Sequence, residues 1–184
     1  LEDAEQKKLQ ILHAMVSPII ILNFPEESLT FLEQGVSVSK ALNDQKSLIR
    51  FYSNMGFFHS TNGRHEEGLR FSGKAFEQAV SMDDLTAMAQ AAPDLCLAYF
   101  ATGDYYKVIE VASIMIDGIR KKEKEKDHFG GPAIVFPALF SFSGFSLAHL
   151  GKINKGISNC MYGLEEALDS DSLFTQCICL YYAG

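Results

Sequence analysis

The chain has 184 residues and a net charge of −7, with 47% hydrophobic and 21% charged residues. This balance is typical of a folded globular protein and argues against disorder over most of the length. The negative charge argues against a nucleic-acid partner, because binding to phosphates requires a basic face.

Membrane and secretory segments are not expected. The apolar runs Ile19 to Leu22 and Ala133 to Phe142 fall short of the roughly 18 apolar residues of a membrane span, and Leu1 to Lys8 is too charged for a signal peptide. The cysteines stand at irregular spacing in apolar helical segments, which favours reduced core residues and a cytoplasmic protein; they are Cys96, Cys160, Cys177 and Cys179. The chain begins without Met and ends within a helical pattern, so we interpret it as a piece of a longer protein.

Apolar periodicity predicts helices along the whole chain. The first two are expected at about 2–22 and 26–42, separated by Asn23-Phe24-Pro25, and the second carries an amphipathic stripe through Leu29, Leu32, Val36 and Ser39. Further helices are predicted at about 46–62, 65–81, 84–102, 104–122, 132–150, 152–168 and 171–183. Aspartates that precede helices are predicted N-caps, namely Asp83, Asp84 and Asp171.

Three segments share a glycine turn, at Gly63, Gly103 and Gly151, with small residues at fixed distances around it. One such residue lies seven positions before each turn, and others lie five and nine positions after it: Gly56, Gly68 and Ser72; Cys96, Val108 and Ala112; Gly144, Gly156 and Cys160. Small residues let facing helices approach closely, and the glycine adopts the left-handed conformation that ends the first helix. Three occurrences in register indicate the tetratricopeptide pattern.

The sequence therefore predicts an all-α fold, an α-α superhelix of tetratricopeptide-like antiparallel helix pairs. We expect a single domain, 1–184, of about four pairs plus a truncated last helix, with repeats at about 2–42, 46–81, 84–122, 132–168 and 171–184. Gly63 and Gly103 are 40 residues apart and Gly103 and Gly151 are 48 apart, so the helices or linkers are longer than in the standard 34-residue repeat.

The segment 120–132 is the one unusual linker. Its alternating charges predict that the preceding helix extends into solvent, until Gly130-Gly131-Pro132 stops it and starts the next helix. A solvated surface stretch is favoured over a docking site for an acidic partner.

No motif for catalysis, metal binding or phosphate binding is present. The histidines are scattered, and His65-Glu66-Glu67 is typical of a helix N-terminus. His59 is predicted to pack between helices. We therefore predict no catalytic residue, no metal site and no cofactor, and we do not expect an enzyme.

A concave groove is the predicted binding surface, because the first helix of each pair lines the inner face of such a superhelix. The inward positions are Arg50, Asn54, Phe57, Gln90, Asp94, Leu97, Phe142, Phe145 and His149. Asp94 follows Pro93, which bends its helix, so it either faces the groove or is hydrogen-bonded within the bend. His149 has either a structural role or a ligand contact. A groove that is polar at one end and aromatic at the other suits a peptide or a neighbouring domain better than an anionic cofactor.

The chain also resembles a known family. Four segments resemble the tetratricopeptide regions that follow the ATPase module in large bacterial adenylate/guanylate cyclase-type signalling proteins. They are Glu33 to Asp44, Phe51 to Gly63, Gly103 to Tyr105 and Phe129 to Lys152. The likeness covers about 26–184 and is shared in part with large ATPase-type transcriptional activators. It implies a regulatory arm whose cyclase and nucleotide-binding chemistry lies elsewhere in the parent protein, and no catalytic residue of those modules has a counterpart here.

We accordingly expect an interaction or regulatory scaffold module whose partner is a protein, a peptide or an adjacent domain, with no nucleic acid and no membrane involved. The alternative is a small-molecule sensor with its ligand in the groove. Self-association is a further expectation, since terminal repeats normally need polar caps.

Overall fold

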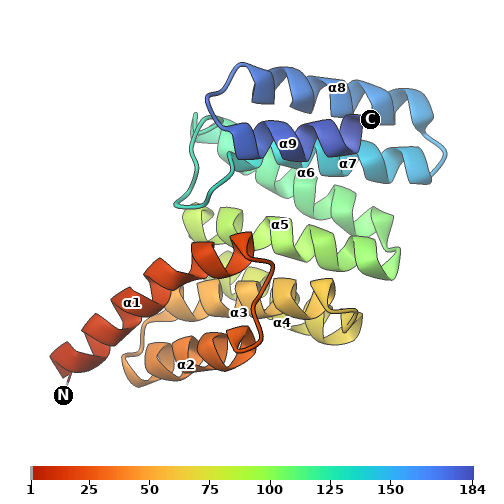
Figure 1. Ribbon diagram of the computed structural model, residues 1–184. Coiled ribbons are helices and arrows are strands. Elements are labelled where there is room, and N and C mark those ends of the chain that lie inside the picture. Colours follow the sequence, from red (N-terminus) through yellow and green to blue (C-terminus); the bar gives the residue numbers. More distant parts are fainter. Residues whose placement is uncertain (1) are drawn as a thin grey trace.

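The computed structural model describes residues 2–184, and over these residues the chain consists of nine helices joined by turns and one longer loop (Figure 1). The helices are α1 (Glu2–Ile21), α2 (Ser28–Ala41), α3 (Gln45–Thr61), α4 (His65–Ser81), α5 (Leu85–Thr102), α6 (Tyr105–Lys121), α7 (Val135–His149), α8 (Ile153–Leu168) and α9 (Leu173–Ala183). Most boundaries fall within two residues of those predicted. None of the described helices is both long enough and apolar enough to cross a membrane.

Helices that follow one another in the chain pack against one another, so the fold is an all-α helical-repeat superhelix, as predicted. Figure 1 shows the pairs stacked in chain order, from α1 and α2 near the N-terminus to α8 and α9 near the C-terminus. Each odd helix from α3 onward also contacts the next odd helix, α3 with α5, α5 with α7 and α7 with α9. The odd helices therefore share one side of the stack.

The turn glycines have the predicted left-handed conformation, with φ of 74° at Gly63, 76° at Gly103 and 78° at Gly151. At each turn the amide after the glycine donates to a carbonyl five residues earlier, for example Arg64 N to His59 O at 2.9 Å. The α2–α3 turn has the same geometry with Asn43 at φ 54°, because asparagine tolerates this conformation better than most residues. The same geometry recurs between α4 and α5, where Asp83 has φ 50° and the amide of Asp84 donates to Ala79 O. The left-handed turn therefore also joins successive pairs, and it does not require glycine.

The small residues of the repeat lie where two helix backbones meet. A Cβ placed on Gly144 would lie 2.6 Å from the carbonyl oxygen of Gly156 and 2.7 Å from the amide of Cys160. One placed on Gly56 would lie 2.7 Å from the amide of Ser72. Backbone atoms cannot move aside as a side chain can, so α3–α4 and α7–α8 require glycine at these positions.

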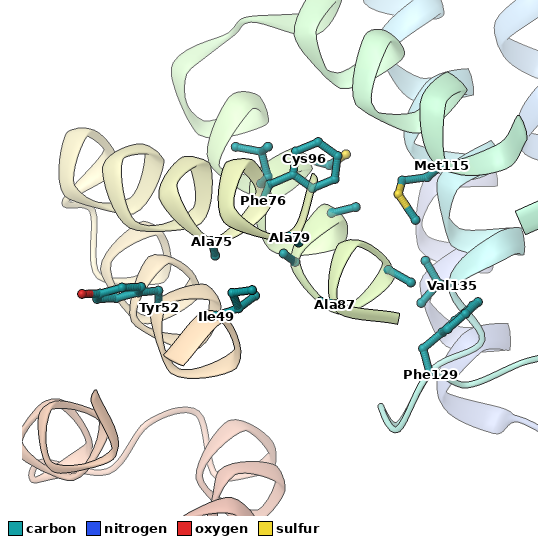
Figure 2. Close-up of a cluster of buried hydrophobic side chains, with 14 of the residues drawn as sticks. Ile49, Tyr52, Ala75, Phe76, Ala79, Ala87, Cys96, Met115, Phe129 and Val135 are labelled. Atoms are coloured by element: carbon teal, nitrogen blue, oxygen red, sulfur yellow. The ribbon is translucent and has the colours of Figure 1, made fainter. Parts of the chain in front are cut away.

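A continuous apolar core runs between the inner and outer helices (Figure 2). Figure 2 shows Ile49 and Tyr52 of α3 facing Ala75 and Ala79 of α4. The small alanines at this contact let α3 and α4 pack closely, while larger side chains fill the remaining space. Further along, Met115 of α6, Phe129 and Val135 continue the same cluster.

Two of the three predicted caps are wrong, Asp83 and Asp171. Asp83 lies one residue before the N-cap of α5, in the left-handed conformation with φ 50°. Asp84 caps α5 as expected, accepting from the amide of Ala87 at 3.1 Å. The last helix is capped by Ser172, whose hydroxyl accepts from the amide of Thr175 at 3.3 Å, and Asp171 is exposed. Aspartate and serine both favour the N-cap position, so residue preference alone does not choose between the adjacent Asp171 and Ser172.

The linker prediction is wrong in one part: most of the stretch is exposed at the surface, as expected, but the helix extension does not form. The charged stretch does not extend α6, which ends at Lys121 with the amide of Lys124 bonded to Ile119 O at 3.1 Å. The physical reason is that the buried face of α6 ends at Ile119, and beyond it the helix has no apolar side chain to bury. The loop instead inserts Phe129, only 3% exposed, into the core, and α7 begins at Val135.

Candidate functional site: a cavity between the odd helices

The inner side of the superhelix holds a cavity of about 540 Å³. Its walls come from α1, α3, α5, α7 and α9, together with the loop between α6 and α7. No even-numbered helix contributes, in keeping with the expectation that the first helix of each pair lines the inner face. The volume lies within the range of known ligand pockets, roughly 300–1,000 Å³.

The structure brings together seven of the nine residues that the repeat register places on the inner face. They are Arg50, Asn54, Phe57, Gln90, Asp94, Leu97 and Phe142. On α3 and α5 these residues recur at steps of three and four, so they share one helix face. Which face of a helix points inward is thus encoded locally.

Phe145 and His149 do not line the cavity, which corrects their predicted placement. The ring of Phe145 packs against Phe100 and Tyr182, with centroids 5.5 and 5.2 Å apart. His149 is exposed and stacks on Tyr105 at 4.6 Å. The cause is α9, which packs against α7 and fills this end of the groove with Tyr182.

Three parts of the wall were missed by sequence reasoning. α1 contributes Val16, Ser17 and Ile20, and the loop contributes residues from His128 to Ala133. α9 adds an aromatic and apolar edge that includes Phe174 and Tyr181. The truncated last repeat could have suggested α9, since an unpaired inner helix still lines the inner face, but the linker offered no local signal.

Arg50 is the cation of the cavity. It is half-buried on α3, and burial lowers the pKa of its guanidinium from the ordinary value. A guanidinium is nevertheless charged in proteins. Within residues 2–184 its side chain makes no ion pair and no hydrogen bond, whereas its carbonyl oxygen accepts from Asn54 Nδ2 at 2.6 Å.

Asp94 faces the cavity and is also hydrogen-bonded, but not within its own helix. Its carboxyl accepts from the hydroxyl of Ser53 on α3 at 2.5 Å. Burial raises its pKa from 3.8 to about 7, against the opposite effect of the Ser53 hydrogen bond. The carboxyl therefore changes its charge close to neutral pH.

Two side-chain amides expose acceptors to the cavity. Asn54 donates through Nδ2 to Arg50 O, and Gln90 donates through Nε2 to Phe129 O at 2.6 Å. No donor from the described chain reaches Asn54 Oδ1 or Gln90 Oε1. The amide hydrogens thus hold the two side chains in place, and the oxygens remain able to accept from an occupant.

The opposite end of the cavity is aromatic. Phe142 meets Tyr182 edge to face at 5.1 Å and Phe100 at 5.7 Å. Tyr182 in turn stacks on Phe100 at 5.7 Å, and burial raises the pKa of its phenol. Interlocked rings of this kind form a rigid apolar surface.

A serine, a histidine and an aspartate meet beside α1, but they do not form a nucleophilic triad. His13 Nε2 lies 2.7 Å from Ser47 Oγ, which itself donates to Asp44 Oδ2 at 2.6 Å. In a triad the histidine stands between the acid and the nucleophile, whereas here the serine stands between. Asp44 is the N-cap of α3, so the cluster caps that helix and ties α1 to it.

No three His, Cys, Asp or Glu side chains of the described residues are grouped so as to hold a metal ion. The chain matches no known protein-family model, and no curated protein is significantly similar to it. No catalytic family is therefore identified for this all-helical fold.

Proposed function

We propose that this chain is an interaction module that binds an extended peptide segment, from a partner protein or an adjacent domain, in the cavity between the odd helices. The observation that supports it is the combination of apolar walls with amide oxygens that have no donor from the protein. Each part of that combination suits a different part of a peptide.

The walls suit the side chains of a peptide. Phe57, Leu97 and Phe142 stand on three successive odd helices, and α9 adds Phe174 at the far edge. Burying apolar surface contributes about 25 cal/mol per Å². An occupant that crosses several helices would bury more of this surface than one held at a single helix.

The amide oxygens suit the backbone of a peptide. Every peptide N–H needs an acceptor when it leaves water, and an unpaired one costs about 1–3 kcal/mol. Asn54 on α3 and Gln90 on α5 present such acceptors from two neighbouring helices. A purely apolar ligand would leave both of them unpaired.

The resemblance to the repeat regions of bacterial cyclase-type signalling proteins supports a regulatory arm that has no catalysis of its own. In that setting the chain recognises a segment, and the parent protein carries the cyclase and ATPase chemistry in the cytoplasm.

Selection from a library tests the proposal. Random dodecapeptides displayed on phage are selected on the immobilised 184-residue chain and counter-selected on Leu97→Trp, whose indole occupies the cavity. Lys155→Trp adds the same ring at an exposed site on α8 and is the matched control. Thermal unfolding verifies that both variants fold. We expect sequences that bind the wild type and Lys155→Trp but not Leu97→Trp; enrichment that is equal on all three would refute the groove as the site.

The second candidate is a small-molecule sensor, which the cavity volume and the aromatic end favour. A metabolite screen by thermal shift with the same variants decides between the two. A metabolite that stabilises the wild type and Lys155→Trp but not Leu97→Trp, without any enriched peptide, would replace the peptide proposal with the sensor.

A further inference from the structure

We propose that Arg50 binds a carboxylate of the occupant, so that the cavity selects apolar peptide segments carrying a single acidic group. This inference rests on the proposed peptide-binding function and names the chemistry that the peptide must have. It follows from the surroundings of Arg50, which differ from those of every other arginine in the chain.

The sequence has four arginines, and three of them lie over aromatic rings. The guanidinium carbon of Arg64 is 5.3 Å from the centroid of Phe58, that of Arg70 is 4.1 Å from Phe71, and Arg120 lies over two rings. Arg50 has no such ring and no ion pair within the described residues, although it is half-buried. The part of a half-buried guanidinium that leaves water is stabilised by an anion or a hydrogen-bond acceptor, which an occupant could supply.

The cavity presents a single permanent cation. Among its described lining residues Arg50 is the one arginine or lysine, and the remaining walls are largely apolar. Recognition of phosphate usually draws on several cations or on a set of backbone amides. One guanidinium with planar donors instead matches one carboxylate, which it can bind through two parallel hydrogen bonds.

A second acidic group on the occupant is disfavoured by Asp94. This carboxyl lines the same cavity from α5, across from α3. In either protonation state it offers no positive charge to a further carboxylate, and when it is ionised it also repels one. The chemistry of the walls therefore selects one acid and otherwise apolar side chains.

The order of the wall residues also orients the occupant. Arg50 shares α3 with Asn54 and Phe57, whereas Phe142 on α7 and Phe174 on α9 form the opposite wall. The acidic group then lies at α3, and the apolar side chains extend across α5 toward α7 and α9. Asn54 Oδ1 lies one helical turn from Arg50, where it can accept from the backbone next to the bound carboxylate.

Two matched peptide libraries test the inference. Both contain acetylated, amidated hexapeptides drawn from Ala, Val, Leu and Phe, with one Glu in the first library and one Gln in the second, placed at each position in turn. Retention on the immobilised chain is read by mass spectrometry for the wild type, Arg50→Gln and Arg50→Lys. Arg70→Gln removes the same charge from an exposed site outside the cavity and is the control.

We expect the wild type and Arg70→Gln to retain Glu peptides about 10- to 100-fold better than their Gln counterparts, as a charge-assisted hydrogen bond implies. Arg50→Gln should bring this ratio close to one while still retaining peptides, and Arg50→Lys should keep part of the preference. The preference should also decrease with added salt.

Two results would overturn the inference, and they differ from each other. If peptides are retained by the groove with a Glu-to-Gln ratio near one, or with a ratio that Arg50→Gln leaves unchanged, the role of Arg50 is wrong and the groove stands. If neither library is retained better by the wild type than by Leu97→Trp, the peptide-binding function itself fails, and this inference fails with it.

Discussion

Asp94 should make the stability of this protein depend on pH in a direction opposite to that of most carboxylates. Burial raises its pKa from 3.8 to about 7. Between these values the folded chain holds the proton and the unfolded chain does not. The free energy of unfolding therefore falls as the pH rises from about 4 to about 7, and it levels off above that range.

The magnitude follows from the raised pKa. Each pH unit by which the folded-state value exceeds the ordinary one costs about 1.4 kcal/mol once the group is ionised, so the full cost approaches ~4 kcal/mol. Asp94 keeps some exposed surface in the cavity, where water screens the charge, and we therefore expect about half of that cost, ~2 kcal/mol.

The variant Asp94→Asn isolates this effect. Asparagine has the same shape, and its Oδ1 still accepts from Ser53, but it carries no charge at any pH. We expect Asp94→Asn to be more stable than the wild type by about 2 kcal/mol at pH 8 and nearly equal to it at pH 4. Half-buried His13 and buried His59 have lowered pKa values. They contribute equally to both proteins and cancel in the difference.

Urea unfolding followed by circular dichroism, at one-unit steps from pH 4 to pH 8, measures the difference directly. A gap that widens with pH and stops growing near pH 7 agrees with the reasoning. Parallel stability curves, or a wild type that gains on the variant as pH rises, would show that Asp94 is ionised without penalty in the folded protein.

Two further predictions concern packing and thiol exposure. Gly144→Ala should cost about 1–3 kcal/mol of unfolding free energy, because its Cβ meets backbone atoms of α8. Gly73→Ala, whose Cβ has nothing within 4 Å, should be neutral or up to about 1 kcal/mol stabilising. Urea unfolding measures both variants, and equal changes in stability would contradict the packing argument. Cys177 is exposed and lines the cavity, while the other three cysteines are buried with raised pKa values. Ellman's reagent should therefore modify one thiol rapidly in the folded chain. The Cys177→Ser variant should lack this rapid reaction, and a bound peptide should slow it in the wild type. Rapid modification of several thiols would contradict the burial of the other three cysteines.

The fold and much of the inner face could be predicted because the signals are local. Gly56 and Gly144 mark close helix contacts, since only small residues allow backbones to approach. The register that places Arg50, Asn54 and Asp94 on one side depends only on the 3.6-residue period. These features need no knowledge of which distant segment lies opposite.

What the tertiary structure alone decided is the set of neighbours. Phe145 has the inward register but is covered by Tyr182 of α9, and Phe129 of a charged linker is buried in the core. Asp94 finds its hydrogen-bond partner on another helix, and Arg50 finds no partner in the described chain. The helical period indicates which face of a helix turns inward. The hydrogen-bond partner of a side chain, and the residues that bury it, depend on packing between segments far apart in the sequence. The inner face is thus a property of the sequence, whereas its unsatisfied cation and its polar pairing exist only in the folded chain.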